Sequence, residues 1–371
     1  MIMITIVLYI AILFYCSAII ALIYGFTKVN SFDYLGLKPK TRFSIVVPFR
    51  NEAENLAILL NSFSKLNYPN DLFEVILVDD ASDCRLQIAD CRFTISTIDN
   101  IRVSNSPKKD AILTAMQSVK TDWIITTDAD CVVNENWLSA LDNYIQLRDV
   151  SMIAGAVSYE CGNSFLHHFQ QLDLASLQGA TIGSFGLKKG FMCNGANFAY
   201  TKSFFQDLNG FEGNDGIASG DDVFLLQKAI ARFSTKVHYL KSENNIVITK
   251  PLDDWKSLFY QRVRWASKTG SYQSNFGKGL ALIVFCGNLA WVLVPIAIGI
   301  GFLSWIPFQD IVLLFLLKFV VDAILIYKAN SFLTKNRMRY LILGSLLYPF
   351  FSVSVALYSL FGKYEWKGRK F

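Results

Sequence analysis

An uncharged apolar run opens the chain and extends from Ile2 to Phe26. As a helix it would measure about 37 Å, at ~1.5 Å per residue, which exceeds the ~30 Å hydrocarbon thickness of a bilayer. A cleaved signal peptide is the competing interpretation, but no basic segment precedes the run and no small-residue cleavage site ends a short apolar core. The sequence therefore predicts a retained transmembrane anchor at residues 1–27.

Three more apolar segments lie near the other end of the chain, at roughly 279–306, 308–328 and 340–362. With 53% hydrophobic residues among 371, the chain is more apolar than an ordinary soluble protein, and the excess is concentrated in these end segments. We therefore expect C-terminal transmembrane helices across 279–362, a basic tail at 363–371 and a more polar region between the membrane parts.

Lysine and arginine positions orient these segments. The loop at 329–339 carries Lys335, Arg337 and Arg339, whereas the loop at 304–310 carries neither residue type. Because cytoplasmic loops are enriched in Lys and Arg, the first loop is expected in the cytoplasm and the second outside. The middle region is flanked by cations at both ends and is then cytoplasmic too. The sequence predicts a multi-pass protein of the inner, cytoplasmic membrane.

The tail conflicts with four full crossings. Four crossings would place its cations outside, against the charge rule; they are Lys363, Lys367, Arg369 and Lys370. The last apolar segment contains Tyr348-Pro349, which allows a broken or re-entrant helix that returns to the cytoplasmic side. The sequence leaves both topologies open.

The cysteine spacing and the net charge limit which kinds of molecule the protein is expected to bind. The seven cysteines are scattered without the spacing of a metal site, which a reduced cytoplasmic compartment explains. The net charge of +5 is modest, and its cations crowd the membrane ends. Membrane lipids with anionic headgroups and a phosphate-bearing substrate are therefore expected as partners, and no nucleic acid.

The middle region, residues 42–250, alternates apolar runs with helical patterns. Strands are expected at Phe43–Pro48 and Phe73–Val78 and in a run that ends at Asp128, with helices at 52–66 and 109–119 between them. Such alternation is typical of an α/β domain with a mostly parallel sheet.

Polar residues follow all three strands: Phe49-Arg50-Asn51-Glu52, Asp79-Asp80 and Asp128-Ala129-Asp130. In parallel sheets, ligands bind beyond the carboxyl ends of the strands. Asp128 and Asp130, spaced i, i+2 in extended chain, point to the same side and suit Mg²⁺ or Mn²⁺ that also holds a diphosphate. An Asp-x-Asp pair alone also fits a solvated turn; the convergence of three acidic strand ends favours a site.

Two further segments follow the sheet. Asp221 and Asp222 precede a helix expected at 223–233, where acids are often only helix caps. Residues 251–278 read as an amphipathic helix that lies on the membrane interface. Its aromatic and cationic side chains are Trp255, Phe259, Tyr260 and Trp265, with Lys256, Arg262, Arg264 and Lys268.

Seven motifs occur in order over about residues 42–270: Val47-Pro48-Phe49-Arg50-Asn51-Glu52, Val78-Asp79-Asp80-Ala81-Ser82, Lys108-Lys109-Asp110-Ala111, Thr127-Asp128-Ala129-Asp130, Asn194-Gly195-Ala196-Asn197, Gly220-Asp221-Asp222 and Gln261-Arg262-Val263-Arg264-Trp265. This set resembles the processive-type family 2 glycosyltransferases, which include cellulose and hyaluronan synthases. The resemblance implies a GT-A fold, Rossmann-like, and transfer of a sugar with inversion from a nucleotide diphosphate sugar, UDP-linked by expectation.

The resemblance also implies residue roles. Nucleotide and donor binding falls to Pro48, Arg50, Glu52, Asp79, Asp80, Lys109, Asp128, Gln261, Arg262 and Arg264. Asp128 and Asp130 would hold the metal, and Asp222 would be the general base, with Asp221 the second choice. The acceptor would lie at Asn194, Gly195, Ala196, Asn197 and Trp265.

Elementary chemistry agrees with these roles. A leaving nucleoside diphosphate needs its developing charge neutralised by a cation, and arginine binds phosphate in bidentate geometry. The attacking hydroxyl must lose its proton to a carboxylate on the side opposite the leaving group. The helix dipole would lower the pKa of Asp222 and keep it ionised.

The expected function is a membrane-bound inverting glycosyltransferase that acts on a glycan or lipid-linked acceptor in cell-surface polysaccharide synthesis. Two alternatives stay open: a sugar transferase that acts on polyprenyl phosphate, and a non-catalytic membrane protein that binds nucleotide sugars. Four apolar segments are fewer than polymer-extruding synthases have, which disfavours a channel within one chain. Outside these motifs, His167, His168 and Cys193 are expected to be structural, and Lys318 and Asp322 either pair or line a polymer path.

Overall fold

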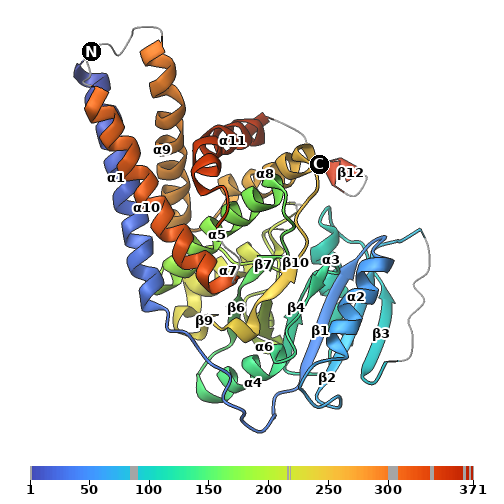
Figure 1. The fold of residues 1–371 in the computed structure, drawn as a ribbon. Helices are drawn as coiled ribbons and strands as arrows, with labels where there is room; N and C mark the ends of the chain where they lie inside the picture. The colour runs from blue at the N-terminus through green and yellow to red at the C-terminus, as the bar shows by residue number, and fades with distance from the viewer. Residues whose placement is uncertain are drawn as a thin grey trace. The chain divides into compact units, whose positions relative to one another are not determined.

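The computed structural model describes residues 2–83, 91–214, 217, 219–299, 308–334, 338–361, 365, 366, 369 and 370. The chain divides into two compact units, which are described separately (Figure 1). The sheet unit contains Val29–Glu160 and Gly190–Lys250. The helical unit contains Met1–Lys28, Cys161–Lys189 and Pro251–Phe371.

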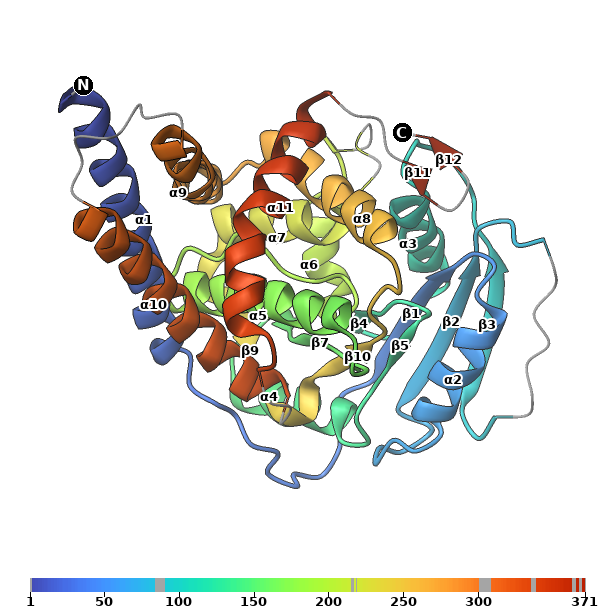
Figure 2. The same ribbon diagram turned by 45° about the horizontal axis from the view of Figure 1, so that its top comes forward.

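A seven-stranded sheet in the order β3-β2-β1-β4-β8-β6-β9 forms the centre of the sheet unit (Figure 2). All pairs are parallel except those of β8, which is antiparallel to β4 and to β6. The predicted mostly parallel sheet is therefore confirmed. Its strands are β1 (Phe43–Phe49), β2 (Phe73–Asp79), β3 (Thr94–Asp99), β4 (Trp123–Thr126), β6 (Met152–Gly155), β8 (Phe198–Thr201) and β9 (Val237–Leu240).

Alternation along β1 separates the two faces of this sheet. Ile45 and Val47 are fully buried and belong to one apolar core with α2 (Ala53–Phe63) and α4 (Trp137–Leu147). In that core the rings of Phe63 and Trp137 stack with centroids 6.2 Å apart. Because successive side chains of a strand point to opposite faces, Val46 belongs to the other face. The strand is buried on both faces, which explains its continuous apolar sequence.

The remaining elements of the sheet unit extend this core. A second, three-stranded sheet has the order β5-β10-β7 and pairs β10 with β5 in antiparallel and with β7 in parallel fashion. Its strands are β5 (Cys131–Val132), β7 (Val157–Tyr159) and β10 (Val247–Thr249). The other helices are α3 (Pro107–Ser118), α6 (Lys202–Asp207) and α7 (Asp221–Phe233), with short 3-10 turns η1 (Ser234–Lys236) and η2 (Glu243–Asn245).

Long helices make up the helical unit: α1 (Ile2–Lys28), α5 (Phe165–Gly186), α8 (Trp255–Ser267), α9 (Asn275–Gly299), α10 (Phe308–Leu333) and α11 (Leu341–Phe361). The turn η3 (Thr269–Ser271) follows α8, and a short pair, β11 (Glu365–Trp366) with β12 (Arg369–Lys370), follows α11. The last apolar segment is one continuous helix through Pro349, so the broken helix, one of the alternatives that the sequence left open, is not formed.

Glycines let α1 and α5 touch backbone to backbone. A Cβ added at Gly183 would come within 2.4 Å of the Leu22 carbonyl oxygen, and one added at Gly25 within 2.1 Å of the Gly183 carbonyl oxygen. Small residues allow this approach, as in many membrane helix pairs. The helix α5, which the sequence placed in the catalytic region, therefore packs with the terminal helices.

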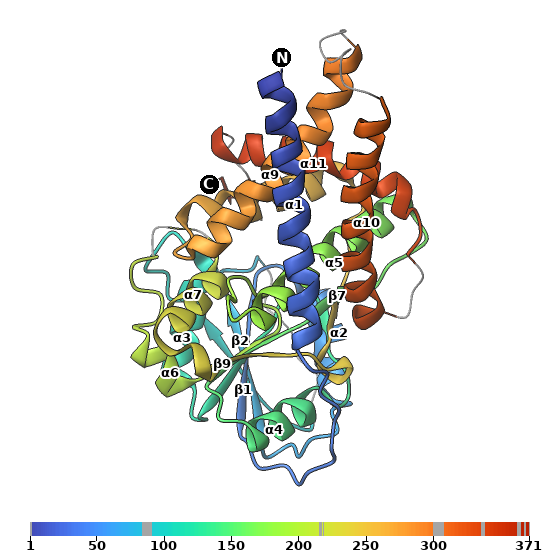
Figure 3. The ribbon, with the colours of Figure 1, turned by 90° about the vertical axis from the view of Figure 1, so that its left-hand side faces the viewer.

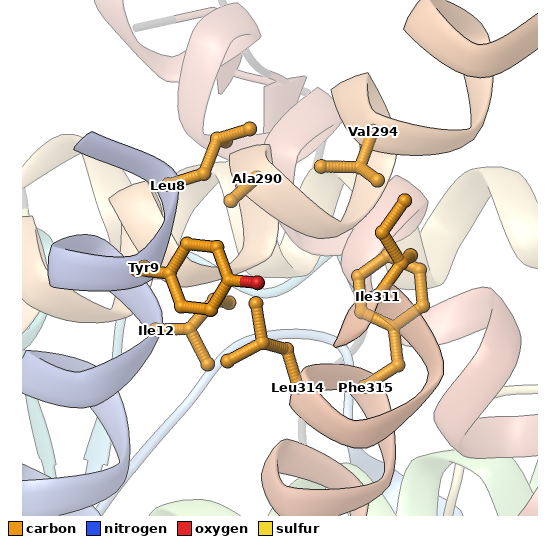
Figure 4. Close-up of a pocket in the computed structure, with 8 residues that line it drawn as sticks. All are labelled: Leu8, Tyr9, Ile12, Ala290, Val294, Ile311, Leu314 and Phe315. Atoms are coloured by element: carbon orange, nitrogen blue, oxygen red, sulfur yellow. The ribbon is translucent and has the colours of Figure 1, made fainter. Parts of the chain in front are cut away.

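Among the residues that the structure describes, three helices are long and apolar enough to cross a membrane: α1, α9 and α11. Their exposed side chains are largely apolar, which is how lipid-facing helices differ from those of soluble proteins. An apolar pocket lies between α1, α9 and α10 (Figure 4) and is lined by Leu8, Tyr9, Ile12, Ala290, Val294, Ile311, Leu314 and Phe315. The Tyr9 hydroxyl donates to Asp310 at 3.1 Å.

Candidate functional site

The loops after β1 and β2 interlock at the carboxyl ends of the strands. The Asn51 side chain donates to Asp83 Oδ2 at 2.7 Å and accepts from the Asp83 backbone N–H at 2.9 Å, and the Asn51 N–H donates to Ser82 Oγ at 2.9 Å. Asn51 and Ala81 have positive φ values of 55° and 58°, which turns each loop sharply. Pro48, the last but one residue of β1, precedes this turn.

Asp79 and Asp80 are held by these loops. Asp79 Oδ1 accepts from the Ser82 N–H at 2.9 Å and from the Ser82 hydroxyl at 2.6 Å. Asp80 is buried and accepts from Asn100 at 2.8 Å, with Arg102 at 3.4 Å. Both carboxylates are thus fixed in position, and that of Asp80 is also paired with the Arg102 guanidinium.

Lys108 lies among acids that come from separate elements. Its Nζ is 2.6 Å from Asp128 Oδ1, after β4, and 3.7 Å from Asp221 Oδ2, at the start of α7. Burial opposes its charge, but Asp128, Asp221 and Asp222 outweigh that cost and raise the pKa of the Lys108 ammonium. The lysine therefore stays charged and holds the acids together.

Asp222 is positioned by backbone donors. Its Oδ2 accepts from the Gly195 N–H at 2.8 Å, and its Oδ1 accepts from the Val223 N–H at 2.7 Å. The Gly195 carbonyl in turn accepts from the Thr126 hydroxyl at 2.8 Å, which ties this loop to the end of β4. A Cβ at Gly195 would lie 3.1 Å from Lys108 Nζ and 3.2 Å from Asp221 Oδ2, so glycine permits this close assembly.

The sequence prediction assigned nucleotide binding to Lys109, but in the structure its neighbour Lys108 is the lysine beside the acids. Lys109, chosen from the sequence, is 1% exposed and donates to the backbone carbonyls of Asn214 at 2.6 Å and Ile217 at 2.9 Å. These contacts give it a structural task inside the unit. Lys108 is the lysine that reaches the acids.

Asn197 also has a structural place. It is 2% exposed, accepts from the Trp137 indole N–H at 3.2 Å and donates to the Ala156 carbonyl at 2.8 Å. Ala196 is buried as well, whereas Asn194 is half-buried and accepts from the Ala196 N–H at 3.0 Å. Within this predicted acceptor motif, Asn194 and Gly195 are the residues beside the acids.

The residue types present fit a divalent ion. Desolvation first, and then the negative charges of Asp128 and Glu52, raise the pKa of the Asp130 carboxyl, so a cation placed beside it would favour its ionised form. Among the described residues, no group of three or more His, Cys, Asp or Glu could hold an ion. Mg²⁺ or Mn²⁺ commonly binds through one or two carboxylates and completes its coordination with phosphate oxygens and water, so Asp128 and Asp130 suffice as protein ligands.

Arg50 and Glu52 complete the loop after β1. Both side chains are half-buried, and Glu52 Oε2 accepts from Asn55 at 2.6 Å. The acidic cluster formed by Asp128, Asp130, Asp221 and Asp222 with Lys108 thus stands at the strand ends beside these loops.

The Gln261-Arg262-Val263-Arg264-Trp265 motif lies on α8 in the helical unit. Arg262 is 5% exposed; its Nε lies 2.6 Å from Asp173 Oδ2 of α5, and its guanidinium lies 4.2 Å from the centre of the Trp265 ring. It also donates to the Gln261 side chain. Arg262 therefore joins α8 to α5. Arg264 is half-buried, and its binding to phosphate remains a prediction.

Residues 44–208 match the family model described as Glycosyl transferase family 2. The match covers less than half of the chain and lies mostly within the sheet unit. The glycosyltransferase AglE of Haloferax volcanii is 27% identical over 125 residues, which are 32% of this chain and 40% of AglE. The poly(ribitol-phosphate) β-N-acetylglucosaminyltransferase TarS of Staphylococcus aureus is 30% identical over 103 residues, 26% of this chain and 18% of TarS. The chain thus spans less than half the length of these curated relatives.

The fold of the family 2 domain agrees with a solved structure. The mannosyltransferase PcManGT of Pyrobaculum calidifontis, in complex with GDP-Man and Mn²⁺, aligns with 96% of this chain and 99% of its own at a TM-score of 0.58 and 15% identity. This likeness confirms the predicted GT-A fold with apolar terminal helices. The processive subtype stays a prediction.

Residues outside the motifs have defined partners. Lys318 and Asp322 pair at 2.7 Å, one of the two predicted outcomes. Cys193 and His168 are buried, which agrees with a structural role. His167 Nε2 lies 2.9 Å from Asp253 Oδ1, a contact that the sequence separation of the two residues concealed.

Proposed function

We propose that the protein is a membrane-bound, metal-dependent, inverting glycosyltransferase that moves a sugar from a nucleotide diphosphate sugar to a glycan or lipid-linked acceptor. The observation that carries the proposal is the convergence of Lys108, Asp128, Asp221 and Asp222 at the carboxyl ends of the strands of a family 2 domain. Three helices able to cross a membrane support the membrane-bound part.

Asp222 is the proposed general base. The backbone N–H groups of Gly195, at 2.8 Å, and of Val223, at 2.7 Å, donate to its two carboxylate oxygens and fix its direction. It accepts the proton of the acceptor hydroxyl as that oxygen bonds to the anomeric carbon, and the bond from that carbon to the diphosphate breaks on the opposite face. The sugar is thereby inverted, and the nucleoside diphosphate leaves.

Charge at the leaving group is the second requirement. A divalent ion held by Asp128 and Asp130 would supply positive charge to the diphosphate when bound. Lys108 lies 2.6 Å from Asp128, so in our proposal it balances the acids and lends its charge to the donor side of the site. Asp79 and Asp80, fixed by Ser82 and Asn100, provide acceptors for nucleoside hydroxyl and amide groups.

A nucleotide-release assay with the full chain in detergent tests this proposal. UDP-, GDP- and dTDP-linked sugars are each incubated with Mg²⁺ or Mn²⁺, and we expect release with one donor class that disappears with EDTA. Asp130→Ala should lower release by about 10²-fold or more, by analogy with the loss of one charge-stabilising group. No metal-dependent release from any donor, in a sample that binds nucleotide, would leave a non-catalytic nucleotide-sugar protein as the better account.

The acceptor is read out separately. Membranes incubated with the labelled donor are extracted with organic solvent and treated with mild acid. Label in an acid-labile lipid identifies polyprenyl phosphate as the acceptor, and label in material that the solvent does not extract identifies a glycan. The proposal allows both a glycan and a lipid-linked acceptor, and this readout decides between them.

A further inference from the structure

Side-chain contacts define the directions of three helices in the helical unit. Tyr9 of α1 donates to Asp310 of α10, and Tyr15 farther along α1 donates to Asp322 farther along α10 at 2.7 Å. The helices α1 and α10 therefore run in the same direction. A Cβ at Gly287 of α9 would lie 2.4 Å from the Tyr15 ring, so the middle of α9 also contacts this part of α1.

The helix α9 runs in the opposite direction. Leu8, near the start of α1, lines the same pocket as Val294, near the end of α9, whereas Tyr15 meets the earlier Gly287. Trp291 also packs on Phe315 of α10, with ring centroids 4.3 Å apart. The three helices thus form an up, down, up bundle, and Figure 3 shows them side by side.

The distribution of charge on α10 is that of a membrane helix. Lys318 is 3% exposed; it pairs with Asp322 at 2.7 Å and lies 4.3 Å from the centre of the Tyr15 ring. The face of α10 that no other helix covers carries Leu313, Leu316, Val320, Ile324 and Tyr327, which are 42–64% exposed. Apolar side chains outside and paired charges inside suit a lipid surrounding. By length and composition alone, α10 is not one of the helices able to cross a membrane, which are α1, α9 and α11.

The helix α11 has the opposite character: it is apolar enough to cross, yet it contacts α5 and α8 along most of its length. It touches α9 at its middle, where the Asn288 side chain donates to Ser352 Oγ at 3.3 Å. Near its start, a Cβ at Gly344 would lie 3.2 Å from Leu172 of α5. In its middle, Phe351 packs on Phe169 of α5 with ring centroids 5.4 Å apart. Near its end, Tyr358 packs on Phe259 of α8, also with centroids 5.4 Å apart.

These contacts extend over most of α11. Gly344 and Tyr358 are about 21 Å apart along the helix at ~1.5 Å per residue. The two helices that they touch are joined to each other by the buried ion pair of Arg262 and Asp173. Figures 1 and 3 show α11 crosswise to α1, α9 and α10. A helix that crossed the bilayer alongside that bundle would leave α5 and α8 within a few turns.

We infer that α1, α9 and α10 cross the membrane and that α11 lies along its cytoplasmic leaflet. The occupant of the uncovered face of α11 is lipid acyl chains. That face carries Ile342, Leu343, Leu346, Leu347, Phe350, Leu357, Leu360 and Phe361, which are 41–89% exposed, and it belongs to the same unit as the exposed apolar faces of α1, α9 and α10. The inference does not depend on the proposed function.

Three crossings also remove the conflict over the basic tail. With α1 entering the cytoplasm, α9 leaves it and α10 returns, so the loop at 329–339 and the tail at 363–371 both lie inside. Both segments are rich in Lys and Arg, as the charge rule requires. Arg339, just before α11, donates to Asn163, just before α5, at 3.1 Å, so the two helices begin close together.

Epitope insertions in the full chain test the topology. One tag is inserted after Thr334 and another after Phe371, and intact spheroplasts are treated with an external protease. We expect both tags to be protected until the membrane is permeabilised, whereas a tag after Ser304 is cleaved at once. External cleavage at Phe371 would indicate four crossings, and external cleavage at Thr334 would indicate that α11 crosses instead of α10; either result overturns the inference.

Spin-label depth separates α11 from α10 with matched pairs of sites. Leu346→Cys and Leu357→Cys lie eleven residues apart on α11, and Leu316→Cys and Tyr327→Cys lie eleven residues apart on α10. In vesicles of phosphatidylcholine and phosphatidylglycerol, with native cysteines replaced, we expect equal depths for the α11 pair. The α10 pair should differ by about 16 Å, at ~1.5 Å per residue.

Two outcomes of the depth measurement would contradict the inference. A depth difference on α11 equal to that on α10 would mean that α11 crosses. Spin-spin broadening at Leu346 that dilution with unlabelled protein removes would mean that a second copy, and not lipid, covers this face. If the cysteine-free chain fails to fold, the tag insertions still decide between the topologies.

Discussion

Two lysine-aspartate pairs of nearly equal length show how differently the two units use charge. In the sheet unit, Lys108 and Asp128 lie 2.6 Å apart, and the Asp128 side chain is 40% exposed. In the helical unit, Lys318 and Asp322 lie 2.7 Å apart, with side chains that are 4% and 20% exposed. The first pair can be reached by a ligand and has further acids around it. The second is closed by Tyr15 and Trp291.

The contrast teaches that a short ion pair says little about function until its surroundings are known. A buried ion pair whose partners are both protein side chains costs desolvation free energy when it forms, and it holds the helices in one register. A partly open pair with surplus acids has chemistry left over for a substrate or an ion. Activity should therefore depend on the sheet unit's pair and stability on the helical unit's pair.

The largest expected effect is on Asp222, the acid nearest to the chemistry in our proposal. Asp222→Asn keeps the shape but cannot accept a proton, so we expect kcat for nucleotide release to fall by about 10²- to 10⁴-fold with little change in melting temperature. Asp149→Asn is the matched control, because Asp149 pairs with Lys236 and precedes β6, at the other end of the sheet. Equal activity of both variants would remove Asp222 as the base.

Exchanging each lysine for methionine tests the comparison of the two pairs directly. Lys318→Met leaves Asp322 buried without its cation and should lower the free energy of unfolding by about 3–5 kcal/mol, and the double variant with Asp322→Leu should recover much of the loss. Lys108→Met should instead reduce kcat/KM by 10-fold or more at near-normal stability. Thermal unfolding and nucleotide release are measured on the same samples. If both variants lost stability and activity to the same extent, the proposed difference between the two ion pairs would be wrong.

The arginines of α8 offer a second contrast. Arg262→Met breaks the buried pair with Asp173 and should cost about 3–5 kcal/mol of stability. Arg264→Met should leave the melting temperature nearly unchanged and raise KM for the donor, if its predicted phosphate contact is made. A stable, inactive Arg262→Met variant would return the phosphate role to Arg262.

Lys109 should behave as a structural residue. Lys109→Met leaves two buried carbonyls, those of Asn214 and Ile217, without their donor, so we expect a loss of about 1–3 kcal/mol in unfolding free energy. The activity of the folded fraction should be retained. Urea denaturation gives the stability, and release rates per folded molecule give the activity; a loss of activity alone would contradict the assignment.

The smallest effect expected is a pH dependence from His238. Burial lowers the pKa of its imidazole below the ordinary value, so the unfolded chain binds the proton more readily than the folded one. Stability from this group is present above pH ~6.5 and is lost as the pH falls through the lowered pKa. His238→Gln, which can still bond to the Tyr144 hydroxyl, should melt with a flatter pH dependence between pH 7 and pH 5.

Much of the domain could be predicted because its signals are local. The strands β1 and β2 begin at Phe43 and Phe73, as expected, since runs buried on both faces are apolar throughout. The predicted helix at 109–119 begins at Pro107 in the structure, because proline is well suited to the first turn. The helix α4 was not predicted.

The site was less predictable where neighbours in the sequence take opposite directions. Lys108 and Lys109 have the same chemistry and differ by about 100° around α3, so their order in the chain does not say which one meets the acids. Asn197 and Arg262 belong to motifs that imply ligand binding, yet core and helix contacts occupy them. Their contact residues, Trp137 and Asp173, lie far away in the sequence, so the motifs alone did not reveal these contacts.

By itself, the sequence determined which segments are apolar, where strands end in acids, and that Asp128, Asp130 and Asp222 stand in motifs that resemble those of family 2 glycosyltransferases. These properties follow from residue type and spacing, which act over a few residues. Only the tertiary structure decided that Lys108 joins the acids, that Arg262 is closed off by Asp173, and that α10 buries its charges while α11 stays beside α5 and α8. Burial and pairing depend on residues far apart in the chain, and their energies appear only once the chain has folded.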